Sequence, residues 1–90
     1  MIEVSRISDS DPMELEVTVS EGGGQSRHRV TLSAEQLQRI CGGGTPESCL
    51  EAAFRFLLDR EPKEAILGKF DISVISKYFP EFEQKIGAYL

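Results

Sequence analysis

The stretch MELEVTVSEGGGQSRHRVTL, residues 13–32, decides the fold of this chain. From Met13 to Ser20 apolar and polar side chains alternate, which is the period-two pattern of a half-buried β-strand. The glycines at positions 22–24 supply the positive φ angles that a tight hairpin turn needs. A second alternating run follows the glycines, so the stretch predicts two antiparallel strands joined by a short turn.

One register of this hairpin satisfies both faces of the sheet. A turn centred on Gly22-Gly23 places Glu16 opposite Arg29, so that opposite charges face each other. The same turn places Leu15 opposite Val30 on the apolar face. Because a shift of one residue would scramble both faces, the pattern predicts this register and no neighbouring one.

The hairpin belongs to a β portion that covers residues 1–33. Ile2 and Val4 alternate with polar neighbours, which indicates a further short strand before the turn residues at 9–12. The sheet is therefore predicted to be an antiparallel hairpin or a three-stranded meander.

Residues 34–90 form the helical portion of the same single domain. Ser33 is suited to cap a first helix that ends at Gly42, and Thr45 a second helix that runs to about Arg60. Prolines then divide the chain into shorter helices, since the residue before a proline avoids helical angles. The β-branched run at 72–76 can form a helix or a strand.

These observations predict an α+β domain over residues 1–90, with four to five short helices packed on one face of the sheet. The composition agrees with a globular chain, because 40% of the 90 residues are hydrophobic and 28% are charged. A chain of this length can bury one thin core.

Charge and hydropathy exclude several classes of function. The formal net charge is −5, and acids exceed bases in both portions, which argues against nonspecific nucleic-acid binding. No run approaches the roughly 18 apolar residues of a membrane span. The N-terminus lacks the pattern of a signal peptide, so we expect a cytoplasmic location and no membrane contact.

Few residues suggest chemistry. Cys41 and Cys49 could form a disulfide, but without an export signal two cysteines are more often reduced, so free thiols are predicted. His28 is the one histidine, and on an apolar strand face it is expected to pack, with a partner for a ring nitrogen. No pattern indicates a catalytic, cofactor or metal site, and we assign no residue to any of them.

The candidate partner contacts are Arg27, Arg29, Tyr78 and Tyr89. The two arginines are interpreted first as cross-strand partners of acids on the sheet. The two tyrosines belong to an aromatic cluster that also supplies the core, and either tyrosine could instead contact a partner.

Residues 54–67, FRFLLDREPKEAIL, are followed by FDISVI at 70–75 and YFPEF at 78–82. Together with the glycine-rich turn and the basic-His-basic strand, these runs resemble a family of short bacterial proteins of unknown function. The resemblance covers most of the chain and implies the same hairpin followed by helices. It implies no activity and no functional residue.

We therefore expect a small non-enzymatic protein-interaction or regulatory module. Its partner would be another protein, or a second copy that pairs with an open edge of the sheet. One alternative is a nucleic-acid-associated regulator that uses Arg27 and Arg29 with Lys69, Lys77 and Lys85. The other is a small ligand-binding protein or enzyme, which needs a pocket with convergent polar groups.

Overall fold

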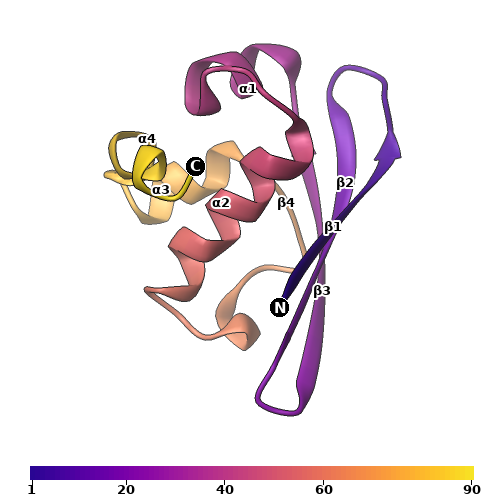
Figure 1. Cartoon of the computed structure of the whole chain (residues 1–90), viewed down its shortest axis with the longest axis vertical. Helices are drawn as coiled ribbons and strands as arrows, with labels where there is room; N and C mark the ends of the chain where they lie inside the picture. Colours follow the sequence, from indigo (N-terminus) through magenta and orange to yellow (C-terminus); the bar gives the residue numbers. More distant parts are fainter.

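Four strands form a single sheet in the computed structural model, which describes residues 1–90 (Figure 1). Three of them make an antiparallel meander in sequence order, namely β1 (Ile2–Ser8), β2 (Met13–Glu21) and β3 (Gly24–Leu32). The three-stranded alternative is thus confirmed. A fourth strand, β4 (Lys69–Asp71), extends the sheet beside β3.

The β2–β3 hairpin has the predicted register. Leu15 lies opposite Val30, and Glu16 lies opposite Arg29. The turn depends on Gly22-Gly23, whose φ angles of 62° and 76° fall in the left-handed region that side chains disfavour. Two successive residues with positive φ match the twist of the flanking strands, so the turn and the apolar face specify the same pairing.

Four α-helices and two short 3-10 helices make up the rest of the domain. They are α1 (Ala34–Cys41), α2 (Pro46–Leu58), η1 (Lys63–Ala65), α3 (Ser73–Tyr78), α4 (Phe82–Lys85) and η2 (Ile86–Ala88). The α-helices are therefore four, not five, and the run at 72–76 belongs mainly to α3. None of these helices is long and apolar enough to cross a membrane.

The boundaries of α1 follow from its capping residues. The Ser33 hydroxyl accepts a hydrogen bond from the Gln36 amide at 3.0 Å, and the Gln36 side chain accepts one from the Ser33 amide at 2.8 Å. This reciprocal pair satisfies two amides that the first turn leaves free. Gly42 ends the helix with a φ of 70°.

The short strand β4 was not predicted. It pairs with β3 in parallel, and its flanks are fixed by hydrogen bonds from the Arg29 amide to the Gly68 carbonyl and from the Ile72 amide to the Thr31 carbonyl. Three residues are too few to show an alternating pattern. The pairing also joins segments about forty positions apart, which no local signal in the sequence encodes.

All helices lie on one side of the sheet, which leaves the other side uncovered (Figure 1). The core between them contains 18 buried residues, with Phe54 and Phe56 of α2 at full burial. From the sheet it takes Leu15, Val17, Val19, Val30 and Leu32. The predicted packing of helices on one apolar face is therefore confirmed.

The prediction of free thiols is wrong, because Cys41 and Cys49 form a disulfide. The left-handed residue Gly42 ends α1 and starts a reversal of the chain, and Gly43 and Gly44 continue it with positive φ. This reversal brings the two Cα atoms to 5.8 Å, within the range that a disulfide spans. The spacing of the two cysteines allowed a disulfide, and only the expected compartment favoured free thiols.

Candidate interaction site

An apolar groove opens between the end of α2, the segment around η1, β4 and α3. Its volume is about 170 Å³, and nine of its ten lining residues are hydrophobic. The lining residues are Leu57, Glu61, Ala65, Ile66, Leu67, Phe70, Val74, Ile75, Tyr78 and Phe79. Two of them also reach the surface, since Leu67 is 47% exposed and Tyr78 is 68% exposed. The groove is thus an apolar hollow bordered by large exposed side chains.

One wall of this groove forms where α2 ends and the chain turns away from the helix. Pro62 follows Glu61, and the chain leaves the helix for the single turn η1 and then for β4. His28 of β3 holds this crossing segment, because its Nδ1 donates a hydrogen bond to the Leu67 carbonyl at 2.7 Å. Its Nε2 accepts one from the Ser26 hydroxyl at 2.8 Å. His28 is 3% exposed, so its predicted packing role with a partner for the ring is confirmed.

Asp71 fixes the opposite end of β4. Its carboxylate accepts hydrogen bonds from the Thr31 hydroxyl at 2.6 Å, the Gln36 amide group at 2.9 Å and the Ser73 backbone amide at 3.0 Å. Burial acts to raise the pKa of Asp71, but the bonds from Ser73, Thr31 and Gln36 outweigh it and lower that pKa to about 2. One carboxylate therefore joins β3, α1 and the start of α3, directly after Phe70, which lines the groove.

Glu61 is the one charged residue in the groove lining. It is half-buried and makes no ion pair. The two nearest bases along the chain are already occupied. Arg60 pairs with Glu81 at 3.5 Å and places its guanidinium 3.6 Å above the Phe56 ring, while Lys63 pairs with Glu64 at 2.6 Å. An unpaired carboxylate thus lies beside an apolar surface.

The four predicted contact residues do not form one site. Tyr78 lines the groove, but Tyr89 lies at a separate, more open depression near the C-terminus. The Tyr89 hydroxyl donates to Asp59 at 2.6 Å, and its ring packs 5.9 Å from that of Phe56. Tyr89 is therefore engaged within the domain, which leaves Tyr78 as the tyrosine available to a partner.

Arg27 and Arg29 lie on the uncovered face of the sheet, away from both tyrosines. Arg29 is opposite Glu16 and beside Lys69 in the register, but neither arginine makes an ion pair with a sheet acid. The same face carries the acids Glu3, Glu14 and Glu16. These acids offset the neighbouring bases, so the face offers no net positive surface of the kind that a polyanion requires.

Strand β1 forms one open edge of the sheet. Met1 and Ser20 exchange both of their backbone hydrogen bonds, so the peptide groups of Ile2, Val4 and Arg6 point outward from the edge. A register irregularity follows Arg6, and the Arg6 side chain lies on the same face as buried Leu15. Bulges and inward-facing charges are features that hinder edge-to-edge pairing.

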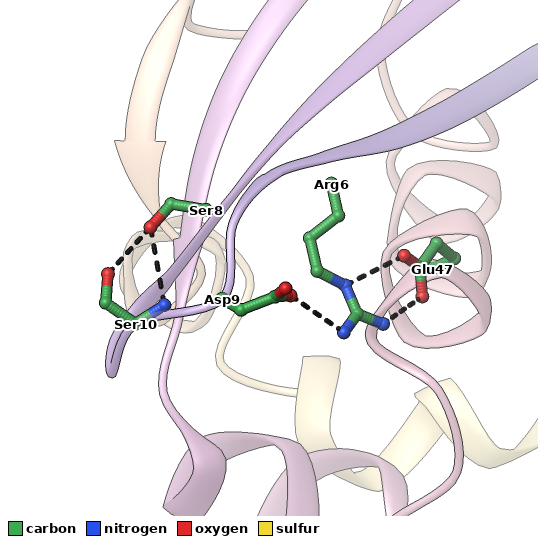
Figure 2. A network of polar contacts seen from close by, with 5 residues as sticks. All are labelled: Arg6, Ser8, Asp9, Ser10 and Glu47. Carbon is green, nitrogen blue, oxygen red and sulfur yellow. Dashed lines mark hydrogen bonds and ion pairs between the residues drawn. The ribbon is translucent and has the colours of Figure 1, made fainter.

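Arg6 also ties this edge to the helices, a role that sequence reasoning missed. Figure 2 shows its guanidinium between Asp9 and Glu47, the latter in the first turn of α2. The bonds to Glu47 are bidentate, at 2.9 and 2.7 Å, and the bond to Asp9 is 3.0 Å. The hydrogen bonds that Arg6 donates to Glu47 and then to Asp9 raise the pKa of Arg6, and the bond from Arg6 lowers the pKa of Glu47.

Other chemistry finds little support in the geometry. Ser26 and His28 are hydrogen-bonded, as a nucleophile and base would be. Neither of them lines the groove or the C-terminal depression, so no hollow brings a substrate to the pair. No three His, Cys, Asp or Glu side chains lie close enough together to hold a metal ion.

No protein-family model matches the chain, and no curated protein or solved structure is significantly similar to it. The resemblance to short bacterial proteins of unknown function stays a prediction.

Proposed function

We propose that this protein is a small interaction module that holds an apolar side chain of a partner protein in the groove. The observation that carries the proposal is the combination of an apolar lining with two exposed rim residues, Leu67 and Tyr78. Large apolar side chains exposed around a hollow are typical of surfaces that a partner covers. Tyrosine is also among the residue types enriched at the positions that contribute most to binding between proteins.

The size of the groove favours a protein partner over a small-molecule ligand. Sites for drug-sized ligands and cofactors measure about 300–1,000 Å³ and contain several convergent polar groups. The groove measures about 170 Å³ and contains one carboxylate. This space suits a single bulky side chain that anchors a larger partner, and it offers little to a catalytic reaction.

Pairing of two copies through β1 is the weaker version of the proposal. The open edge supports it, but the irregularity after Arg6 and the inward position of that side chain oppose it. The nucleic-acid alternative is likewise disfavoured by the acids beside Arg27 and Arg29.

A cytoplasmic location also stays a prediction. Disulfides persist mainly in oxidising compartments, so the bond between Cys41 and Cys49 weighs against it.

The proposal is tested by selecting a displayed library of random peptides against the purified chain. Two variants form a matched pair, because Leu67 and Ile7 are 47% and 46% exposed and only Leu67 lies in the groove. We expect peptides with a bulky apolar residue in common. Their binding should weaken at least about tenfold with Leu67→Glu and stay unchanged with Ile7→Glu.

Circular dichroism of both variants shows whether the fold is kept. A selection without a shared apolar residue, or peptides that bind both variants equally, would rule out the groove as the docking site.

A further inference from the structure

Glu61 places a charge in the otherwise apolar lining of the groove. It is the one charged lining residue, and no base of this chain pairs with it. The neighbouring bases Arg60 and Lys63 are held by Glu81 and Glu64. Glu61 as a residue is half-buried at the wall of the groove.

From this arrangement we infer that the partner is a protein segment that carries a Lys or Arg next to its apolar anchor. The inference rests on the proposed function and specifies the partner for the same groove. The anchor side chain fills the apolar hollow, and the adjacent cation pairs with Glu61. A partner with an acid in that position would leave two carboxylates close together without a cation between them, which is unfavourable.

The charge of the whole chain acts in the same direction. The formal net charge is −5, so a basic segment is attracted from a distance and an acidic segment is repelled. Two further bases are sequence neighbours of lining residues but do not belong to the lining. Lys69 lies beside Arg29 in the sheet register, while its neighbour Phe70 faces the groove. Lys77 of α3 is exposed and lies outside the lining.

The length of the recognised segment follows from the small size of the groove. A hollow of about 170 Å³ accepts one anchor, and a Lys or Arg side chain is long enough to reach a carboxylate at the wall from an adjacent position. A short motif of one bulky apolar residue and one neighbouring cation is therefore sufficient. Specificity comes from the cation, because many proteins can present an apolar residue.

The experiment uses the tightest peptide from the selection described above. Three versions are synthesised, in which the residue beside the anchor is Arg, Gln or Glu, and each is titrated into the labelled chain by NMR. For the intact chain we expect binding to weaken about threefold from Arg to Gln and further from Gln to Glu. The Arg-to-Glu difference should shrink at high salt.

The matched variants are Glu61→Gln in the groove and Glu51→Gln on the exposed surface of α2. With Glu61→Gln the preference for Arg should disappear while the apolar anchor still binds. With Glu51→Gln the preference should remain. Equal binding of all three peptides to the intact chain would overturn the inference and leave the proposed function standing. A selection that yields no groove-dependent peptide would overturn both.

Discussion

The β2–β3 hairpin and the segment from residue 62 to residue 90 keep their shapes by different means. Each strand of the hairpin has nine residues, joined by a continuous backbone ladder. The later segment contains no helix or strand longer than six residues. Its short elements are held by side chains, namely His28 at Leu67, Asp71 at three donors, and a group of aromatic rings around Phe56.

This difference has a consequence for stability. A ladder of backbone bonds loses little when one side chain changes, because neighbouring pairs keep the strands together. A short helix has no neighbouring pairs of this kind, since helices of one or two turns are stable only through tertiary contacts. We therefore expect the segment at 62–90, which forms the groove, to be the more easily disrupted part of the molecule.

The largest effect should come from Phe56→Ala. The Phe56 ring is fully buried and lies 5.1 Å from Phe82 and 5.9 Å from both Phe79 and Tyr89. Removing it should lower the free energy of unfolding by about 3–5 kcal/mol. Hydrogen exchange should show faster exchange in α3, α4 and η2, while the amides of the β2–β3 hairpin stay protected longest.

The milder change Phe56→Leu keeps much of the side-chain volume and should lower the free energy of unfolding by less. The amides of α3, α4 and η2 should again exchange faster than those of the β2–β3 hairpin. Equal loss of protection in the hairpin and in residues 73–88 would show that the two regions unfold as one unit and that the later segment is not the weaker one.

Cys41→Ser should have the next largest effect, because the disulfide joins the end of α1 to α2 across the glycine loop. Closing a loop between positions eight apart stabilises the folded chain by about 2.5 kcal/mol through the lost entropy of the unfolded state. Denaturant unfolding without reductant measures the loss. A reductant should destabilise the intact chain by a similar amount and leave the variant unchanged. Two reactive thiols in the untreated chain would instead support the prediction made from sequence.

Asp71→Asn tests how side-chain bonds hold β4. The pKa of Asp71 is lowered to about 2 in the folded state, so its carboxylate contributes stability above the pKa of the unfolded chain, about 4. That contribution is lost as the pH falls towards 2. The variant should be less stable than the intact chain by about 1–2 kcal/mol at pH 7, after allowance for partial exposure, and the difference should be much smaller at pH 2.

Thermal unfolding at pH 7, 4 and 2 gives the comparison. Glu51→Gln, which changes an exposed acid without a hydrogen-bond partner, serves as the control and should show little gap at any pH. If the difference in stability between Asp71→Asn and the intact chain did not change with pH, the hydrogen bonds of Asp71 would stabilise the fold without any contribution from its charge.

The β2–β3 hairpin and the segment at 62–90 also differ in how far the sequence predicts them. The register of the hairpin could be predicted because a two-residue turn and an alternating pattern lie within twenty residues. The caps of α1 could be predicted for the same reason. The spacing of the two cysteines allowed a disulfide, but the expected compartment led to the prediction of free thiols. The strand β4 could not be predicted, since it depends on where two segments about forty positions apart meet in space. Local patterns contain no information on such meetings.

The candidate site was predictable only in part. Tyr78 was among the expected contact residues, because an aromatic residue on a short helix indicates either core or contact. The groove itself draws on α2, η1, β4 and α3, so no single stretch of sequence reveals it. Glu61 preceded a proline and indicated a helix end, whereas its position beside an apolar hollow emerges only from the fold.

The smallest effect should come from Glu16→Gln, which asks what fixes the hairpin register. Glu16 lies opposite Arg29, but the two side chains make no ion pair and lie on the uncovered face. Exposed charge pairs on proteins contribute about 0–1 kcal/mol, and an unformed pair contributes at the lower end. We expect a loss of at most about 0.5 kcal/mol in denaturant unfolding. Arg29→Gln should behave alike, and a double-mutant cycle should give a coupling near zero. The register would then depend on the apolar face and the glycine turn, whereas a coupling above about 1 kcal/mol would show that the charges help to set it.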